Sequence, residues 1–247
     1  MQRPPRDEAK VRADLAAAYR MAALEGWDDT IYTHLSASVP GEPGRYLINP
    51  FGALFEEITA SSLVKVDVQG RVVDGSGAKV NPSGFAIHGA VHAARPEVEC
   101  VIHLHSPWGV ALAMLPGGLQ STSQWAMRLH GRLGRHAYEG LALGADEQQR
   151  LVQRLGMLDG LILDHHGPLV VGRTVAEAWI LMSMLEKAAR AQLRAMAAFG
   201  GALPGVPDDV AELTRRQWVG DGSEWDGDAE WPALLRRLDR RLPGYDA

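Results

Sequence analysis

Two closely spaced histidines, His103 and His105, lie in an apolar run at residues 100–105. The run is typical of a buried strand, in which alternate residues project from the same face. Both imidazoles can therefore meet one ion. Because burying neutral imidazoles without a partner is costly, a bound metal would account for them. Hydrogen-bonded core histidines without a metal are the alternative that this short motif leaves open.

A third ligand is expected from His165 or His166, because this pair also follows an apolar strand. Adjacent side chains on an extended chain point in opposite directions, so we expect one of the two to join the cluster. Three imidazoles with an open position form a metal centre that can bind water or substrate. His88 and His92 share one face of a helix, and they are expected to pack or to lie at the surface rather than to bind the metal.

Helices and strands that alternate along the chain must position these side chains. Hydrophobic periodicity and end signals predict helices at residues 7–25, 85–94, 146–155 and 174–199, and another that begins at Ser106-Pro107. Short apolar runs predict strands at residues 45–48, 63–68, 71–73, 100–105, 161–164 and 168–171. This order predicts an α/β or α+β core in which helices cover a sheet.

The overall composition is that of a soluble globular chain. Of 247 residues, 46% are hydrophobic and 22% are charged, and the single cysteine, Cys100, excludes a disulfide within the chain. A net charge of −5 gives no electrostatic signal for nucleic-acid binding. No apolar run reaches the roughly 18 residues that span a bilayer, and residues 1–10 lack the apolar stretch of a signal peptide. We therefore expect a cytoplasmic protein with a small-molecule substrate and without a membrane or nucleic-acid partner.

The composition changes after residue 200, which divides the chain into a body, residues 1–200, and a tail, residues 201–247. The tail contains Trp218, Trp225 and Trp231. Leaving these indole rings in water would forgo a large hydrophobic stabilisation. We therefore expect the tail to pack on the body or on a neighbouring subunit, with a short final helix at residues 231–242.

Several segments in a fixed order resemble the class II aldolase/adducin family. They are residues 85–88 (FAIH), 94–96 (ARP), 103–106 (HLHS) and 166–172 (HGPLVVG). Upstream, residues 48–52 (INPFG) and 59–67 (TASSLVKVD) are similar to the adducin-like branch of the family. The resemblance covers roughly residues 10–200, and the combination is more specific than any single piece.

The resemblance implies an α/β fold: a three-layer α/β/α sandwich around a largely antiparallel central sheet. It also implies a homotetramer with active sites between subunits. Sugar-phosphate aldolases of this family bind a divalent metal, usually zinc, through three histidines that match His103, His105 and His166. The metal polarises the substrate carbonyl and stabilises an enediolate. Three neutral histidines also suit Fe²⁺, Mn²⁺ or Co²⁺, so the sequence does not decide the metal.

The chain departs from the family pattern at two places. The aldolases carry an acidic residue four positions before the histidine that matches His88, and here that position is Gly84. Their phosphate-binding Gly-Asn-x-Ser loop reads THLS at residues 33–36, and without the glycine the backbone approaches a phosphate less closely. A phosphorylated substrate is therefore not expected. The candidate substrate-binding residues are Thr33, Ser36 and Ser83.

Two residues are candidates for the missing acid/base. Tyr138 lies in a segment that resembles the family's His-x-Tyr-x-Gly stretch, where a tyrosine of the neighbouring subunit donates a proton. His34 could titrate near neutral pH. Asp29 and Tyr32 lie in the same loop as His34, and only coordinates can show where they point.

These observations leave three functional hypotheses. The first is a metal-dependent lyase that catalyses aldol cleavage or decarboxylation of a small, non-phosphorylated carbonyl or carboxylate compound. The second is an adducin-like scaffold, which the upstream segments favour but the retained histidines and the lack of a long basic tail oppose. The third is an Fe(II)-dependent oxygenase on the same fold. We rank the lyase first.

Overall fold

The computed structural model describes residues 7–140, 144–219 and 227–247, without the side chains of residues 82–85, 145 and 219. Within these residues, seven strands form one sheet in the order β3-β2-β1-β4-β7-β6-β5. Their bounds are β1 His34–Ser38, β2 Arg45–Ile48, β3 Val64–Asp67, β4 Cys100–His103, β5 Leu133–His136, β6 Gly160–Leu163 and β7 Gly167–Gly172. Neighbouring strands are antiparallel except β5 and β6, which run parallel.

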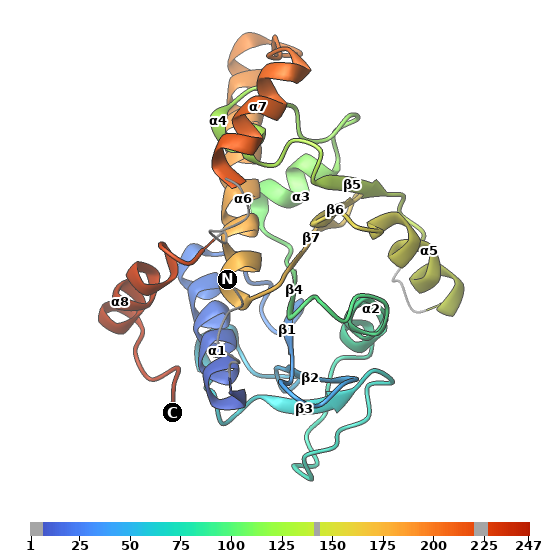
Figure 1. Cartoon of the computed structure of the whole chain (residues 1–247), viewed down its shortest axis with the longest axis vertical. Helices are drawn as coiled ribbons and strands as arrows, with labels where there is room; N and C mark the ends of the chain where they lie inside the picture. The colour runs from blue at the N-terminus through green and yellow to red at the C-terminus, as the bar shows by residue number, and fades with distance from the viewer. Residues whose placement is uncertain (1–6, 141–143, 220–226) are drawn as a thin grey trace.

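Helices cover both faces of this sheet (Figure 1). On one side, α1 (Glu8–Glu25), α3 (Pro107–Ala113) and α6 (Val175–Phe199) contribute to the larger hydrophobic core. On the other side, α2 (Pro82–Ala94) and α5 (Ala145–Leu155) pack a second core against β4, β6 and β7. The remaining helices are η1 Phe55–Glu57, α4 Gln124–Arg128, α7 Asp208–Val219 and α8 Trp231–Arg241. The expected three-layer α/β/α fold with a largely antiparallel sheet is confirmed.

Local sequence signals fix the ends of the long helices as expected. The Asp7 side chain accepts a hydrogen bond from the Lys10 amide at 2.8 Å, and Gly26 ends α1 with a φ of 67°. Helix α6 begins where Thr174 Oγ1 accepts from the Glu177 amide at 2.9 Å. These bonds satisfy amide groups that have no partner inside the helix.

Strand β1 places its polar residues on one face. Leu35 and Ala37 belong to the larger core beneath α1 and α6, while the other three residues of the strand alternate with them. Ser36 and Ser38 hydrogen-bond to histidines of α2, so the polar face of β1 packs against that helix. The two-residue period of a strand thus separates an apolar core from a buried polar stripe.

One predicted strand is absent and another is shorter than expected. Residues 71–73 form no strand: Val72 makes an isolated bridge to Val66, although the Asp67 amide does bond to the Arg71 carbonyl and closes the turn. The strand expected at residues 100–105 ends at His103, because Ser106 is already the N-cap of α3 and the chain must turn before Pro107. Histidine 105 therefore lies outside β4.

Helix α7 was not expected, because prolines 204 and 207 and the neighbouring acidic residues read as loop. The final helix lies where it was expected, at Trp231–Arg241. Trp231 is 5% exposed, and its Nε1 donates to Asp14 Oδ1 of α1 at 2.9 Å. Trp218 is 46% exposed, whereas Trp225 lies outside the described residues.

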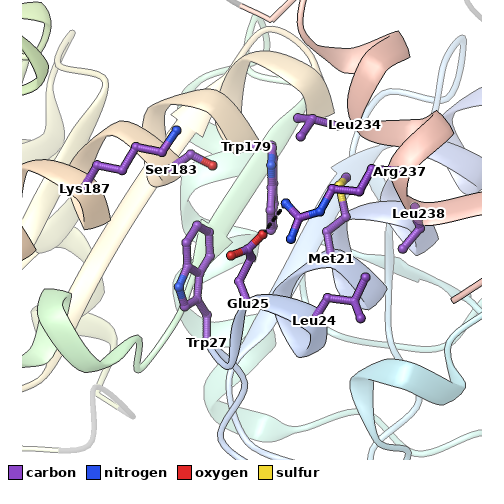
Figure 2. A pocket seen from close by; sticks show the side chains of 10 residues that line it. All are labelled: Met21, Leu24, Glu25, Trp27, Trp179, Ser183, Lys187, Leu234, Arg237 and Leu238. Atoms are coloured by element: carbon purple, nitrogen blue, oxygen red, sulfur yellow. Dashed lines mark ion pairs between the residues drawn. The ribbon is translucent and has the colours of Figure 1, made fainter. Parts of the chain in front are cut away.

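A small pocket separates the tail helix α8 from α1 and α6 (Figure 2). The Trp27 and Trp179 rings stack in its wall with centroids 5.2 Å apart. Glu25 and Arg237 form an ion pair of 2.6 Å that joins α1 to α8. The tail therefore packs on the body of its own chain through both apolar and charged contacts.

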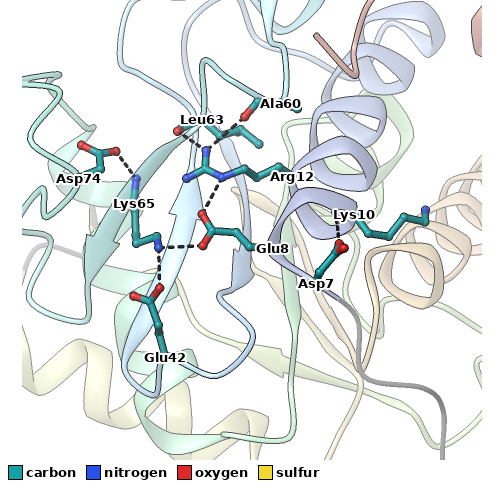
Figure 3. Close-up of polar contacts among 9 residues, drawn as sticks. All are labelled: Asp7, Glu8, Lys10, Arg12, Glu42, Ala60, Leu63, Lys65 and Asp74. Carbon is teal, nitrogen blue, oxygen red and sulfur yellow. Dashed lines mark hydrogen bonds and ion pairs between the residues drawn. The ribbon is translucent and has the colours of Figure 1, made fainter.

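At its other end, α1 is tied to the edge of the sheet by a polar network (Figure 3). Arg12 donates to the carbonyl oxygens of Ala60 and Leu63, at 3.2 and 2.8 Å. The Lys65 ammonium of β3 bridges Glu8 and Glu42 at 2.8 and 2.7 Å. In the described part of the chain, no helix is both long enough and apolar enough to span a membrane.

Candidate metal centre

Three histidines converge where the interior strand β4 ends and β7 begins. His103 ends β4, His105 lies in the connection to α3, and His166 lies between β6 and β7. Each offers one ring nitrogen, and these atoms lie within 4.8 Å of one another. His103 Nε2 and His166 Nε2 are 3.2 Å apart. The structure thus brings together the three residues expected from the sequence, in an arrangement that could hold a divalent metal ion.

His166, rather than His165, joins this cluster. His165 adopts a left-handed φ of 57° and its side chain is exposed. A non-glycine residue rarely takes this conformation, and here it turns the chain so that the two neighbouring imidazoles separate. The expectation that one of the pair joins the cluster is confirmed.

The ring of His103 is oriented by the backbone of β7. His103 Nδ1 lies 3.1 Å from the carbonyl oxygen of Pro168. Because a carbonyl oxygen can only accept, Nδ1 carries the proton and Nε2 keeps its lone pair. This lone pair belongs to the nitrogen that faces His166, which is the tautomer that metal binding requires.

His105 has the same tautomer for a different reason. Its Nδ1 lies 2.8 Å from Asp29 Oδ2, and a carboxylate accepts the ring proton. Its Nε2 is buried and has no hydrogen-bond partner. A buried ring nitrogen with a free lone pair, aimed away from its carboxylate partner, is costly unless a ligand binds to it. The donor set therefore fits a metal such as zinc.

Burial keeps two of the three histidines, His103 and His166, uncharged. It lowers the pKa of His166 to about 4, and the neighbouring His105 lowers it further in the same direction. Burial also holds the pKa of His103 well below its usual range, with added contributions from His166 and His105. Neutral imidazoles are the form that binds metals, so both side chains are ready to coordinate at neutral pH.

An open pocket of about 540 Å³ leads to the cluster. Its lining residues are Asp28, Asp29, His105, Pro107, Val110, Tyr138, Gly140, His165 and His166. Tyr138 lies in the lining of its own chain's pocket and is 53% exposed. Among the described lining residues there are two carboxylates and no lysine or arginine.

A comparison with known protein families covers the same three histidines. The model of the Class II Aldolase and Adducin N-terminal domain matches residues 13–193, which include all three histidines. The chain belongs to the class II aldolase and adducin family.

Members of this family match nearly the whole chain. A Caulobacter vibrioides protein, provisionally named an aldolase class 2 protein, is 46% identical over 96% of this chain and 92% of its own length. Alpha-adducin of Rattus norvegicus is 38% identical over 94% of this chain, which spans only 33% of that longer protein.

Solved structures of the family share the fold. An aldolase II superfamily protein from Pseudomonas syringae has a TM-score of 0.92 and 42% identity, covering 99% of this chain and 98% of that one. An L-fuculose 1-phosphate aldolase from Glaciozyma antarctica has a TM-score of 0.84 and 30% identity, covering 97% and 96%.

His34, a candidate acid/base, lies beside the metal centre but inside the core. It pairs with His103 across β1 and β4, with ring centroids 6.2 Å apart. It is 3% exposed, and neither ring nitrogen has a hydrogen-bond partner. Burial lowers the pKa of His34 to about 3, with smaller contributions from His105 and His166. The expectation that His34 titrates near neutral pH is therefore wrong.

Ser36, a candidate for substrate binding, is occupied by the polar stripe between β1 and α2. Its Oγ lies 2.6 Å from His88 Nδ1 and 2.8 Å from His92 Nε2. Ser38 Oγ completes the stripe at 3.0 Å from His92 Nδ1. Ser36 is fully buried and does not line the pocket, so its role here is to hold the two histidines. As expected, His88 and His92 pack and do not join the cluster.

The other two candidate substrate-binding residues are Thr33 and Ser83. Thr33 is buried, its Oγ1 has no partner, and its φ of 65° belongs to the left-handed region. Glycine adopts that region without strain, which explains the glycine of the family pattern at this position. The side chain of Ser83 lies outside the described residues. Gly84 lies in the first turn of α2 and offers no carboxylate.

Asp29 is the functional candidate whose role the sequence did not reveal. It lies 76 residues from His105 in the chain. Asp28 and Asp29 follow the end of a helix, where adjacent aspartates are also common in solvated loops. Their spacing therefore does not predict a contact with the metal centre. Only the pairing of β1 with β4 brings the loop before β1 to the histidine that follows β4.

Proposed function

We propose that this protein is a metal-dependent carbon–carbon lyase that acts on a small, non-phosphorylated carbonyl or carboxylate compound by aldol-type cleavage or decarboxylation. The observation that carries the proposal is the convergence of His103, His105 and His166 at an open pocket. A zinc ion held by these nitrogens supplies Lewis-acid stabilisation of negative charge on a substrate oxygen. The three residues would hold the ion, and the pocket lined by His105 and His166 would give a substrate access to it.

Charge in the pocket supports a non-phosphorylated substrate. Asp28 and Asp29 line the pocket, and among its described lining residues no lysine or arginine balances them. A phosphate dianion would lie in the field of both carboxylates, whereas arginine and lysine are the side chains that usually bind phosphate. A neutral carbonyl compound meets no such repulsion, and a compound with one carboxylate brings one negative charge to the pocket rather than two.

Decarboxylation places the lowest demand on the side chains present. An aldol reaction in the usual direction needs a base beside the carbonyl, and Gly84 offers none at the family's acidic position. Loss of CO₂ leaves the bonding electrons on the adjacent carbon without prior removal of a proton. The carbon then needs one proton, and we assign this step to the hydroxyl of Tyr138, a half-exposed residue in the lining of the pocket.

The similarity to alpha-adducin favours an adducin-like scaffold as the second candidate. Two features argue against a scaffold because it would not need them: the His105 Nε2 without a hydrogen-bond partner, and the exposed Tyr138 in the pocket. An Fe(II)-dependent oxygenase ranks third, and it differs from the lyase in consuming oxygen. Measuring bound metal separates the scaffold from both enzymes, and measuring oxygen uptake separates the two enzymes.

The test is a steady-state assay of the zinc-loaded protein on a panel of small β-keto acids and hydroxy-carbonyl compounds. We expect turnover with at least one compound and a loss of roughly 10²–10⁴-fold in kcat for Tyr138→Phe, the range of general acid catalysis. A zinc-loaded protein that turns over no member of the panel would favour the scaffold. Equal kcat values for Tyr138→Phe and the wild type would remove Tyr138 from the mechanism.

A further inference from the structure

The loop between α1 and β1 holds an unusual turn at the edge of the metal centre. The Tyr32 amide donates to the Asp29 carbonyl at 2.8 Å, and the same two residues form an isolated β-bridge. Thr30 and Thr33 adopt left-handed φ values of 52° and 65°. Branched residues rarely take this conformation, and they keep it only where the surrounding structure imposes it. The turn is therefore a fixed feature rather than a relaxed loop.

This turn delivers the Asp29 carboxylate to His105. Oδ2 of Asp29 lies 2.8 Å from His105 Nδ1, on the ring edge opposite the unpartnered Nε2. Free neutral histidine favours the tautomer with the proton on Nε2, which has no lone pair at that nitrogen. A carboxylate on Nδ1 reverses this preference and also restricts rotation of the ring.

We propose that Asp29 is a positioning residue for the metal centre: it holds His105 in the Nδ1-protonated tautomer, with Nε2 directed at the ion shared with His103 and His166. The inference rests on the proposed metal binding of the three histidines. The Pro168 carbonyl fixes the tautomer of His103 in the same way, and no side-chain substitution can remove that carbonyl. The orientation of His105, in contrast, depends on the side chain of Asp29, which a substitution can remove.

Asp28 provides a matched control for the charge of Asp29. It lines the same pocket and carries the same charge, but the contacts described for its carboxylate include no histidine. If the carboxylates acted only by attracting a cation, the two residues would contribute alike. If Asp29 acts through His105, only its loss changes the tautomer of that ring.

The experiment compares full-length wild type, Asp29→Ala, Asp29→Asn and Asp28→Ala in two measurements. Nitrogen-15 NMR of the metal-free proteins reports the tautomer of His105, and competition with a chromophoric chelator gives the zinc dissociation constant. We expect Asp29→Ala to shift His105 to the Nε2-protonated form and to raise the Kd roughly 10- to 100-fold. Asp29→Asn should retain the tautomer, because its amide oxygen still accepts from Nδ1, and should bind zinc better than Asp29→Ala.

Two results would overturn the proposal while leaving the proposed function intact: an unchanged His105 tautomer in folded Asp29→Ala, or equal increases in Kd for Asp28→Ala and Asp29→Ala. A wild-type protein that binds no zinc would overturn the proposed function itself, and the positioning role with it. Thermal unfolding of each variant establishes that the fold is intact. Asp29→Leu, which keeps nearly the size of the side chain but cannot accept the Nδ1 proton, takes the place of Asp29→Ala if that variant does not fold.

Discussion

The ring of His103 is fixed by Pro168, whose carbonyl oxygen accepts the His103 Nδ1 proton at 3.1 Å. Pro168 lies at the start of β7, two residues after His166, so the turn into β7 carries one ligand and the strand itself orients another. A shift of β7 along β4 would therefore disturb two ligands at once. The pairing of β4 with β7, together with the short turn between β6 and β7, sets the spacing between His103 and His166.

Sugar phosphates should be poor substrates. Gly84 lacks the family's acidic side chain, Thr33 replaces its glycine, and Asp28 and Asp29 line the pocket without a described lysine or arginine. We expect turnover of L-fuculose 1-phosphate and L-rhamnulose 1-phosphate well below about one per second, the low end of typical enzymes. A steady-state aldolase assay with zinc, manganese or cobalt supplied gives this number.

The Glaciozyma antarctica relative, which is named an L-fuculose 1-phosphate aldolase, is the natural positive control for that assay. If this protein turns over either sugar phosphate at about one per second or faster, another residue replaces the missing acid, and the interpretation of Gly84 is wrong.

Stability should fall as the pH drops below neutrality, because the histidines of the polar stripe are buried in the neutral form. Burial lowers the pKa of His92 to about 4, against about 6.5 in the unfolded chain. The unfolded state therefore takes up a proton first, and stability that is complete above pH 6.5 is lost as the pH falls toward 4. The contribution of His92 is on the order of 3 kcal/mol at the acid end.

Urea unfolding at pH 8, 6 and 5 measures this dependence. His92→Gln cannot titrate, and it keeps a polar group near Ser36, so its free energy of unfolding should decline less steeply between pH 8 and pH 5. Identical slopes for the variant and the wild type would mean that His92 does not carry the effect.

The tail should contribute to the stability of the body through Trp231. This side chain is almost fully buried and donates to Asp14, so Trp231→Ala leaves both a cavity and a lost hydrogen bond. We expect a loss of about 3–5 kcal/mol in the free energy of unfolding. Trp218→Ala is the control: Trp218 is half exposed and contacts the Arg128 guanidinium, so its loss should cost less than about 1 kcal/mol. Equal losses in the two variants would contradict the packing of the tail.

The protein should assemble as a homotetramer. The family resemblance implies a tetramer. In addition, the large apolar side chains of Trp125 and Phe199 are exposed on the described surface, where a neighbouring subunit could cover them. Sedimentation velocity at micromolar concentration should show a species of about four times the 26.8 kDa chain mass. A single species at the chain mass would contradict this expectation.

The sequence predicted the fold and the three clustered histidines because their signals are local. Apolar strands directly precede both histidine pairs, and caps such as Asp7 and Gly26 mark helix ends within a few residues. The resemblance then selected His166 over His165, and the left-handed φ of His165 supplies the physical reason.

The contacts around the cluster could not be predicted in the same way. The bond of Asp29 to His105 depends on the pairing of β1 with β4, and the bonds of Ser36 depend on how α2 packs over β1. The sequence also does not show how deeply a residue is buried, which is why His34 was expected to titrate near neutral pH. Burial and pairing arise from the whole fold, and no short segment encodes them.

Bound zinc is the quantity that tests the central claim most directly. Elemental analysis of zinc-loaded, dialysed protein should give one zinc per chain for the wild type and a sharp loss for His105→Ala and His166→Ala. His165→Ala removes the exposed histidine next to His166 and should keep full occupancy, which separates the ligand from its neighbour. Full occupancy in His105→Ala or His166→Ala, or a wild type that retains no zinc, would contradict the assignment of the metal centre.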